Sequence, residues 1–319
     1  MASKQSILGK AFEYACASSL ANRCPGAVLR KDAALDTASG FFFNECTPKR
    51  QRDLSSGATA VVSALERLEP CLSESSSQSL SIGLQSDAKG IAGDVRDVVC
   101  SRGPWQIGIS CKHNNDAVKH SRLSSSIDFG AKWLAHPCSR QYFEAIDPLF
   151  SRLDGLQKRG ALWRDLPDKI DGYYVPILNA FMDELRRLNS QYRDVPERLV
   201  RYLIGRNDFY KVISYENSRA TRLVAFNLAG TLNMPSSSRK PIVEVPVIRM
   251  PRHIYYIGFL ESENGGPSDN TALVICDQGW EISLRIHNAS SKVEPSLKFD
   301  VQLVSYPRDV YNEFIPWDA

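Results

Sequence analysis

Residues 93 to 124 read GDVRDVVCSRGPWQIGISCKHNNDAVKHSRLS, a stretch that predicts two adjacent strands followed by a basic, hydroxyl-rich segment. The first expected strand is Asp97–Cys100 and the second is Ile107–Lys112. The link between them, Ser101–Pro104, has the composition of a tight connection. The stretch therefore predicts a hairpin with polar residues at the ends of its strands.

Successive side chains of a strand point to opposite faces, so the hairpin sorts into an apolar and a polar face. Ser110 and Lys112 share the polar face, and Gly108 beside them leaves room on it. If Asp97 on the neighbouring strand faces the same way, a carboxylate and an ammonium converge on one small volume. The apolar face, which we expect to point toward a core, carries Ile107, Ile109 and Cys111.

A converging carboxylate and lysine are the groups that a metal-dependent nuclease needs. The carboxylate holds Mg²⁺ through oxygen, and the lysine orients or deprotonates the attacking water and neutralises the phosphorane-like transition state. The same residues also fit a surface hairpin with an ordinary aspartate and lysine. The hairpin alone leaves both interpretations open.

Length and composition indicate a globular chain without a membrane segment. The 319 residues, 43% of them hydrophobic, suffice for one large domain or two of ordinary size. No run of about 18 apolar residues occurs, and the start MASKQSILGK lacks the apolar centre of a signal peptide. We therefore expect a cytoplasmic protein.

Cysteine and histidine spacing argues against a zinc site. The eight cysteines form no C-x-x-C pair, and the five histidines have no H-E-x-x-H or similar spacing. Reduced, mostly structural thiols are expected, and any metal should be held by oxygen.

The charge is unevenly distributed along the chain, although the net charge of +3 is mild. Residues 100–140 carry six Lys or Arg against two acids, and residues 196–252 carry ten against four. Residues 271–319 carry four against seven. Two basic stretches could form one groove for a polyanion, or they could simply be solvated surface.

Helical patterns dominate the first two thirds of the chain. Residues 4–22 predict an amphipathic helix on which Glu13 is the only acid, and residues 57–68 predict a second helix. A strand is expected at residues 80–84, and mainly helical structure from residue 129 to 205. Glu13 could be solvated, or it could reach a metal from the side if its helix packs beside the sheet.

Beyond residue 209 the composition predicts strands rich in Val, Ile, Tyr and Phe, several of them plausible antiparallel neighbours. The expected fold class is α/β, with helices preceding a β-rich C-terminal part. The seven runs are FYKVISY (209–215), TRLVAFNL (221–228), IVEVPVI (242–248), IYYIGFL (254–260), TALVICD (271–277), WEISLRIHN (280–288) and LKFDVQLVS (297–305).

Two short motifs compete for functional interpretation. His113-Asn114-Asn115 invites comparison with HNH nucleases, but the partner histidine and its metal-binding context are missing. Residues 285–288, Arg-Ile-His-Asn, with Lys292 close behind, could read base edges or bind phosphates, and could equally be a polar strand edge.

Several long strings resemble the HaeIII-type family of type II restriction endonucleases, from about residue 90 to the end. The resemblance implies Mg²⁺-dependent cleavage of double-stranded DNA at GGCC by a PD-(D/E)xK nuclease core. We expect a nuclease core at 1–140, a helical region at 141–205 and a β-rich DNA-recognition region at 206–319. The strings are GDVRDVV, IGISCKHNNDAVKHSRLS, YLIGRNDFYKV, FNLAGTLN and GWEISLRIHNASSKVEPSLKFDVQL.

The resemblance assigns catalytic roles to the hairpin. Asp97 matches the metal-binding aspartate and Lys112 matches the catalytic lysine, but Ser110 stands where the family pattern has a second acid. A serine hydroxyl is a weak Mg²⁺ ligand compared with a carboxylate, so the second acid should come from elsewhere. Glu13 is the first candidate for this metal ligand and Asp94 is the second.

A GGCC site favours arginine or lysine contacts to guanine in the major groove.

A palindromic site is usually recognised by a symmetric homodimer, although a monomer acting twice remains open. The missing acid at Ser110 also leaves an alternative, a catalytically decayed nuclease fold that binds DNA without cleaving it. The DNA-binding candidates are Lys119, Arg122, Arg249, Arg252, Arg285, His287, Asn288 and Lys292.

Overall fold

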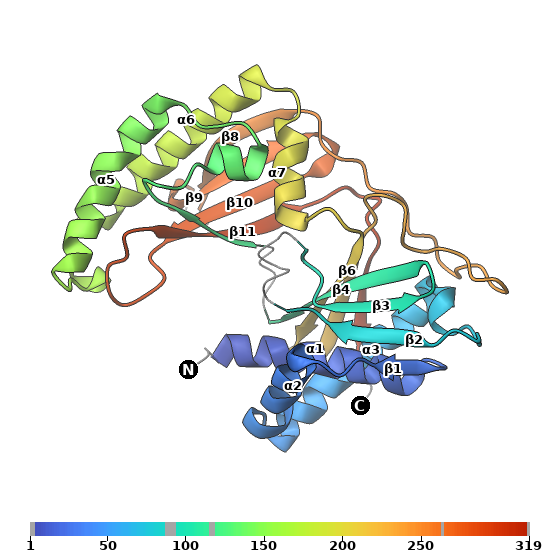
Figure 1. Cartoon of the computed structure of the whole chain (residues 1–319). Coiled ribbons are helices and arrows are strands. Elements are labelled where there is room, and N and C mark those ends of the chain that lie inside the picture. The colour runs from blue at the N-terminus through green and yellow to red at the C-terminus, as the bar shows by residue number, and fades with distance from the viewer. Residues whose placement is uncertain (1–3, 87–93, 115–118, 263–264, 318–319) are drawn as a thin grey trace. The chain divides into compact units, whose positions relative to one another are not determined.

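The computed structural model of the chain describes residues 4–86, 94–114, 119–262 and 265–317 (Figure 1). The chain divides into two compact units. Unit 1 consists of residues 1–116, 205–248 and 309–319, and unit 2 consists of residues 117–204 and 249–308. Each unit contains helices and one β-sheet, so the fold is mixed α/β, as the sequence predicts.

Unit 1 contains three helices, seven strands and two short helical turns among its described residues. The helices are α1 (Lys4–Arg23), α2 (Ala33–Gly40) and α3 (Pro48–Leu68), with turns η1 (Phe41–Glu45) and η2 (Pro70–Leu72). The strands are β1 (Ala27–Leu29), β2 (Leu80–Leu84), β3 (Val98–Arg102), β4 (Trp105–His113), β6 (Phe209–Tyr215), β7 (Ala220–Phe226) and β12 (Asn312–Pro316).

The sheet of unit 1 is mixed, in the order β1-β2-β3-β4-β6-β7-β12. The expected hairpin is confirmed, because β3 and β4 pair antiparallel with Val98 opposite Ile109. On its other side β4 pairs with β6 in parallel, whereas β7 and β12 add antiparallel strands. The strand that carries Lys112 therefore lies in the middle of the sheet.

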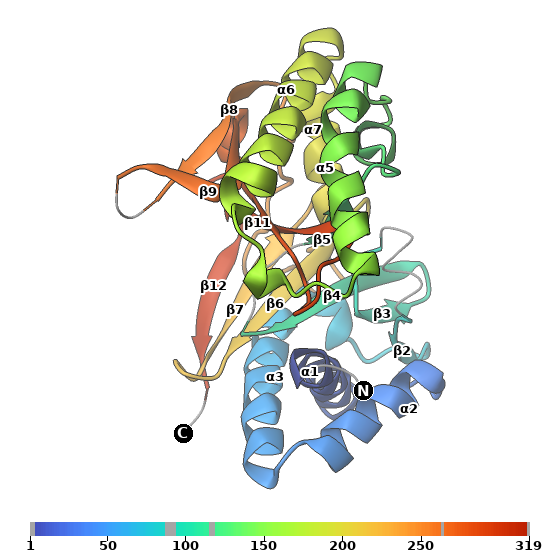
Figure 2. The ribbon, with the colours of Figure 1, turned by 90° about the vertical axis from the view of Figure 1, so that its left-hand side faces the viewer.

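Helices α1 and α3 pack together against this sheet (Figure 2). Phe12 and Leu20 of α1 are fully buried in one core with Ile107 and Ile109 of β4. Gly57 lets α3 approach closely, because a Cβ there would lie 3.2 Å from the hydroxyl oxygens of β6 and β7 side chains. This packing fixes the side of α1 that carries Glu13 against the β3–β4 hairpin.

The prediction of a strand at residues 242–248 is wrong. The segment joins no sheet, and Pro246 lacks the N–H that a ladder requires. Two asparagine side chains bind its backbone instead. Val245 N donates to Asn233 Oδ1 at 3.0 Å, and Asn227 Nδ2 donates to Val245 O at 2.9 Å. Strand β12, which the sequence analysis missed, pairs with β7 at the edge of the sheet.

Unit 2 contains an antiparallel sheet in the order β5-β11-β10-β9-β8. Its strands are β5 (Lys119–Leu123), β8 (Ile254–Glu261), β9 (Pro267–Cys276), β10 (Glu281–His287) and β11 (Leu297–Ser305). Its helices are α5 (Arg140–Lys158), α6 (Val175–Gln191) and α7 (Val195–Ile204), with turns η3 (Gly130–Leu134), η4 (Trp163–Asp165), η5 (Ile170–Tyr174) and η6 (Asp277–Gly279).

An aromatic core joins the helices of unit 2 to its sheet. Phe181 of α6 packs on Phe299 of β11 with ring centroids 5.1 Å apart, and Trp133 stacks on Tyr202 of α7 at 5.0 Å. Four residues at helical spacing along α6 belong to this core, because Ile177, Phe181, Leu185 and Leu188 are fully buried.

The two units do not coincide with the three regions expected at 1–140, 141–205 and 206–319. Strands β6 and β7 were expected with the C-terminal strands, but β6 completes the first sheet beside β4. The helices at 141–204 share unit 2 with the last strands. The boundaries between the two units follow from pairing between strands distant in sequence. The periodicity of residues along the chain does not predict such pairing.

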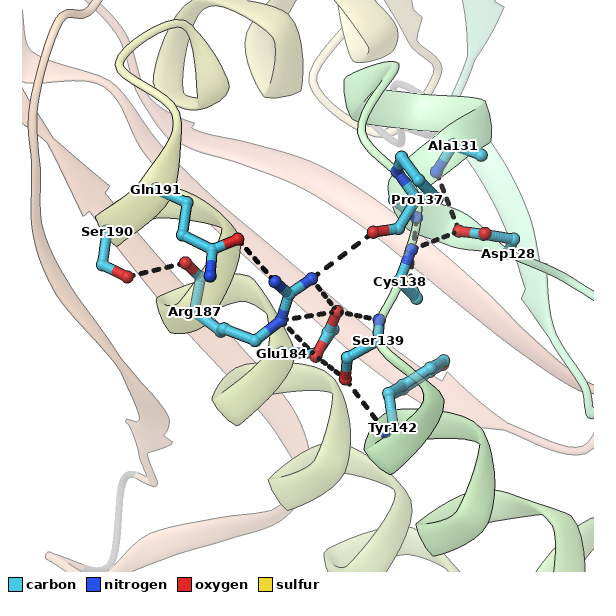
Figure 3. Close-up of polar contacts among 11 residues, drawn as sticks. Asp128, Ala131, Pro137, Cys138, Ser139, Tyr142, Glu184, Arg187, Ser190 and Gln191 are labelled. Carbon is cyan, nitrogen blue, oxygen red and sulfur yellow. Dashed lines mark hydrogen bonds and ion pairs between the residues drawn. The ribbon is translucent and has the colours of Figure 1, made fainter.

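A buried carboxylate on α6 anchors the start of α5 (Figure 3). Glu184 accepts hydrogen bonds from Ser139 N at 2.6 Å and Ser139 Oγ at 2.7 Å, and Arg187 binds it at 2.7 Å. Ser139 in turn caps α5 by accepting from Tyr142 N at 3.1 Å. Because each charge in this cluster is paired, it serves the packing of unit 2.

We expect Glu184→Ala to lower the free energy of unfolding of unit 2 by about 3 kcal/mol, because it leaves partners of a buried charge unsatisfied. Glu144→Ala is the matched control, since that carboxylate lies in an exposed pair with Arg140 on α5. Its expected loss is below about 0.5 kcal/mol. Urea unfolding measures both, and equal losses would contradict the anchoring role of Glu184.

Candidate active site

The hairpin fixes Asp97 at the entrance of β3. Asp97 N donates to Ile109 O at 2.8 Å, and Gln85 N donates to Asp97 O at 2.8 Å, which extends the pairing by one residue on each side. The backbone of Asp97 is therefore held between β2 and β4.

One oxygen of Asp97 collects three donors from β4. Asp97 Oδ2 accepts from Cys111 N at 2.7 Å, from Ser110 Oγ at 3.2 Å and from Lys112 Nζ at 3.4 Å. Ser110 is buried and contacts the carboxylate as a hydrogen-bond donor. The residue that replaces the expected acid thus orients Asp97 in the described structure, and Oδ1 remains for a further contact.

Glu13 of α1 faces the same carboxylate. It is 6% exposed, and Lys10, one helical turn earlier, binds it at 3.0 Å. Burial, followed by the negative charge of Asp97, raises the pKa of Glu13 to about 7, although Lys10 and Lys112 lower it. A bound cation would relieve the repulsion between two such carboxylates.

Lys112 stays protonated at neutral pH. Burial, the largest single influence, lowers the pKa of this lysine, but the charges of Asp97, Cys111 and Glu13 together outweigh it and raise the pKa above the ordinary value. The group facing Asp97 is therefore an ammonium. Such a group can orient water or stabilise negative charge, and it cannot remove a proton until its environment changes.

Asp94 lies outside this group of residues. Arg96 binds its two oxygens at 2.8 and 2.7 Å, and Gln85 Nε2 donates to it at 3.0 Å. Burial raises the pKa of Asp94, but these hydrogen bonds, Arg96 first, lower it to about 2. The space above Gly108 is filled by the Arg96 side chain, whose Cδ would lie 1.9 Å from a Cβ at that glycine.

His113 offers no support for an HNH centre. Its ring is buried 6.3 Å from that of Phe12, and burial lowers its pKa. Asn115, the third residue of the motif, lies outside the described residues. The described part of the structure assigns His113 to the packing between β4 and α1.

The donor set fits a hard cation such as Mg²⁺. No group of three His, Cys, Asp or Glu suited to a metal occurs within residues 4–86, 94–114, 119–262 and 265–317. Mg²⁺ commonly uses one or two carboxylates and completes its coordination with water and substrate phosphate. Glu13 and Asp97 meet that requirement. The eight cysteines are all free, and the hydrogen bond with Cys16, then burial, raises the pKa of Cys111, which argues against thiolate ligands.

Two of the expected DNA-binding residues meet on one face of the unit 2 sheet. Asp300 of β11 binds Arg285 at 3.2 Å and Lys298 at 3.3 Å, and His287 Nδ1 lies 3.6 Å from the same carboxylate. Arg285 stands opposite Asp300 in the β10–β11 register and its side chain is 57% exposed. A basic cluster around one carboxylate, which we call the Asp300 cluster, therefore faces away from the buried Ile286 and Phe299.

The other candidates are dispersed in unit 2. Arg122 binds Ser296 at 2.8 Å and Glu294 at 2.9 Å. Asn288 is used within its own loop, because its amide donates to the carbonyls of residues 290 and 292 at 2.6 and 2.7 Å. The side chain of Lys119 lies outside the described residues. The exposed candidates are Arg249, Arg252 and Lys292.

Sequence reasoning missed three residues at these sites. Lys10 precedes Glu13 by three positions, and this i,i+3 spacing was a usable signal. Asp300 and Lys298 alternate on one strand, but their meeting with Arg285 depends on the β10–β11 register, which the sequence does not reveal.

Residues 9–307 match the family described as HaeIII restriction endonuclease. The chain is 38% identical over 326 residues to the type II restriction enzyme HaeIII of Haemophilus aegyptius, with 100% of both chains covered. No solved structure matches the chain. Among the described residues, no helix combines the length and apolarity needed to cross a membrane.

Proposed function

The chain belongs to the HaeIII restriction endonuclease family, and we propose from this premise that it hydrolyses double-stranded DNA at GGCC with Mg²⁺ as its cofactor. The family and the full-length relative are type II restriction enzymes, so the chain is a site-specific deoxyribonuclease. The observation that supports the proposed chemistry is the meeting of Asp97 with Lys112 and Glu13. Asp97 is bound by Lys112 at 3.4 Å, and its charge raises the pKa of the buried Glu13.

The proposed core is of the restriction-endonuclease type. Helix α1 precedes β2, β3 and β4, with Asp97 at the start of β3 and Lys112 near the end of β4. The lysine-bearing strand then pairs in parallel with β6. This order of helix and strands supports a PD-(D/E)xK assignment in which α1 supplies the second acid.

The residues have distinct proposed roles. Glu13 and Asp97 would hold Mg²⁺, and Ser110 and Cys111 N keep Asp97 oriented through their hydrogen bonds. The bound ion would neutralise the carboxylates and polarise the scissile phosphate. Lys112, as an ammonium beside Asp97, positions the attacking water and stabilises the negative charge that develops on the phosphate oxygens. Asp94 has no part in this proposal, because Arg96 holds it.

DNA is the proposed partner of unit 2 as well. Arg285 is the favoured base-reading residue, since it is exposed and Asp300 fixes its guanidinium, a group that pairs with guanine O6 and N7. His287 and Lys298 lie beside it. Cleavage of both strands of a palindrome favours a homodimer with one centre per strand.

Digestion of a plasmid with Mg²⁺ tests the function. Fragments whose ends lie within GGCC, and no cleavage of the same plasmid methylated at those sites or lacking them, would support it. Sequence-specific binding without cleavage at any Mg²⁺ concentration would instead support a decayed nuclease. Cleavage at a different sequence would overturn the GGCC assignment and leave the catalytic proposal standing.

The affinity for Mg²⁺ is expected to rise about tenfold from pH 6 to pH 8. Glu13 must lose its proton to bind the ion, and its pKa of about 7 means that the ionised fraction grows across this range. Titration calorimetry at pH 7 in two buffers with different ionisation enthalpies should detect about half a proton released per ion bound. Glu13→Gln, which carries no proton, should abolish that release, and its persistence would contradict the assignment.

We expect Arg285→Ala to reduce discrimination between GGCC and single-mismatch sites by about 10- to 100-fold. The change removes the guanidinium that Asp300 orients but leaves the unit 1 centre intact. Cleavage rates on matched and mismatched duplexes measure the ratio. Arg140→Ala, which removes an exposed arginine paired with Glu144, is the control. An unchanged ratio for Arg285→Ala would assign base reading to other residues.

A further inference from the structure

Unit 2 contains a basic cavity that lies apart from the Asp300 cluster. The cavity has a volume of about 530 Å³ and is lined by Asn189, Arg193, Arg252, His253 and Ile254. Asn189 lies near the end of α6 and Arg193 in the link to α7, whereas the other three lie where the chain enters β8. Two segments distant in sequence therefore build one electropositive surface.

The two arginines keep their charge available. Among the described residues, no carboxylate pairs with the guanidinium of Arg193 or Arg252. Two acids next to these arginines already have other partners: Asp194 follows Arg193 in sequence, and Asp277 contacts the backbone of Arg252. Asp194 binds His136 at 2.8 Å and also binds Arg198. Asp277 accepts backbone N–H groups from the segment that leads into β8.

The backbone around the cavity is held in place by hydrogen bonds. Asp277 Oδ1 accepts from Arg252 N at 2.7 Å and from His253 N at 3.0 Å, and Asp277 N donates to His253 O at 2.9 Å. On the other side, the ring of Tyr192 stacks on that of His136 at 3.7 Å, directly before Arg193. The positions from which both arginines extend are thus fixed before any ligand arrives.

We propose that this cavity binds a phosphodiester of the DNA backbone, which rests on the proposed function of the chain as a DNA-cleaving enzyme. Two unpaired guanidinium groups match the geometry and charge of phosphate oxygens, and Asn189 and His253 add hydrogen-bonding groups. Ile254 supplies an apolar surface of the kind that a deoxyribose contacts. Such contacts position DNA without reading its sequence.

The test uses the full chain, inactivated with Ca²⁺ in place of Mg²⁺, and two duplexes that differ only in having or lacking GGCC. The dissociation constant of each is measured across a range of salt concentrations for the parent and for R193A/R252A. The double variant should weaken binding to both duplexes by a similar factor. It should also lower the slope of log affinity against log salt by about 2, since each lost phosphate contact removes about 0.9.

Two further variants keep the result interpretable. R193K/R252K retains both charges and should retain most of the slope, whereas R159A removes an exposed charge at the end of α5, outside the cavity, and should leave the slope unchanged. An unchanged slope in R193A/R252A, or a loss confined to the GGCC duplex, would overturn the inference alone. A parent that binds neither duplex would overturn the proposed function together with it.

Discussion

Replacing Lys112 with alanine is expected to slow DNA cleavage by about 1,000-fold at saturating DNA and Mg²⁺. The ammonium faces Asp97 at 3.4 Å, and the Asp97 carboxylate raises its pKa against the lowering effect of burial, so a positive charge is held at the centre. Alanine removes the charge that would meet the developing negative charge on phosphate. Binding of DNA should change little, because this interaction strengthens mainly in the transition state.

Single-turnover cleavage rates separate this effect from binding. Lys49→Ala is the control, since Lys49 is an exposed lysine in the first turn of α3 in the same unit. Thermal unfolding of both variants checks the fold. If Lys112→Ala cut DNA as fast as the parent, the centre would have to lie elsewhere in the chain, whatever the family pattern suggests.

Replacing Glu13 with glutamine is expected to weaken Mg²⁺ binding by at least about 100-fold, because it removes one of the two carboxylates proposed as direct ligands. The amide has nearly the same size, so the packing of α1 on β4 should persist. Cleavage at low Mg²⁺ should be nearly lost and should recover in part at high Mg²⁺. Titration calorimetry and cleavage rates across a range of Mg²⁺ concentrations measure the two effects.

Asp94→Asn decides between the two acids proposed for the second metal ligand. Because Arg96 and Gln85 hold the Asp94 carboxylate, we expect its replacement to leave the Mg²⁺ dependence close to that of the parent. Some stability should be lost with the ion pair. A shifted Mg²⁺ requirement in Asp94→Asn, with normal behaviour of Glu13→Gln, would transfer the metal role to Asp94.

Local patterns in the sequence predicted the hairpin and the helix that flank this site. Alternation along residues 107–112 separated Cys111 from Lys112, and helical spacing defined the helix of Glu13, since both depend on neighbours a few residues apart. The meeting of Glu13 with Asp97 was a hypothesis based on fold analogy. The structure places their charges close enough to interact.

Other features depend on contacts that no local pattern reports. The ion pair between Asp94 and Arg96 is one example. The Arg96 side chain lies over Gly108, a contact that the sequence does not reveal. The 242–248 run has the composition of a strand, yet Asn233 and Asn227 bind its backbone in place of a neighbouring strand. The addition of β6 to the first sheet could not be read from composition, because the same residues suit either sheet.

The parallel pairing of β4 with β6 has a consequence for how the protein folds. Residues 109 and 210 stand opposite each other, and the helices of unit 2 are synthesised between them. Until β6 arrives, the strand carrying Lys112 has one open edge, which is a template for pairing with other chains. Such distant pairings form late and slowly. We therefore expect a slow, concentration-sensitive refolding phase in which nuclease activity returns after most of the helical signal.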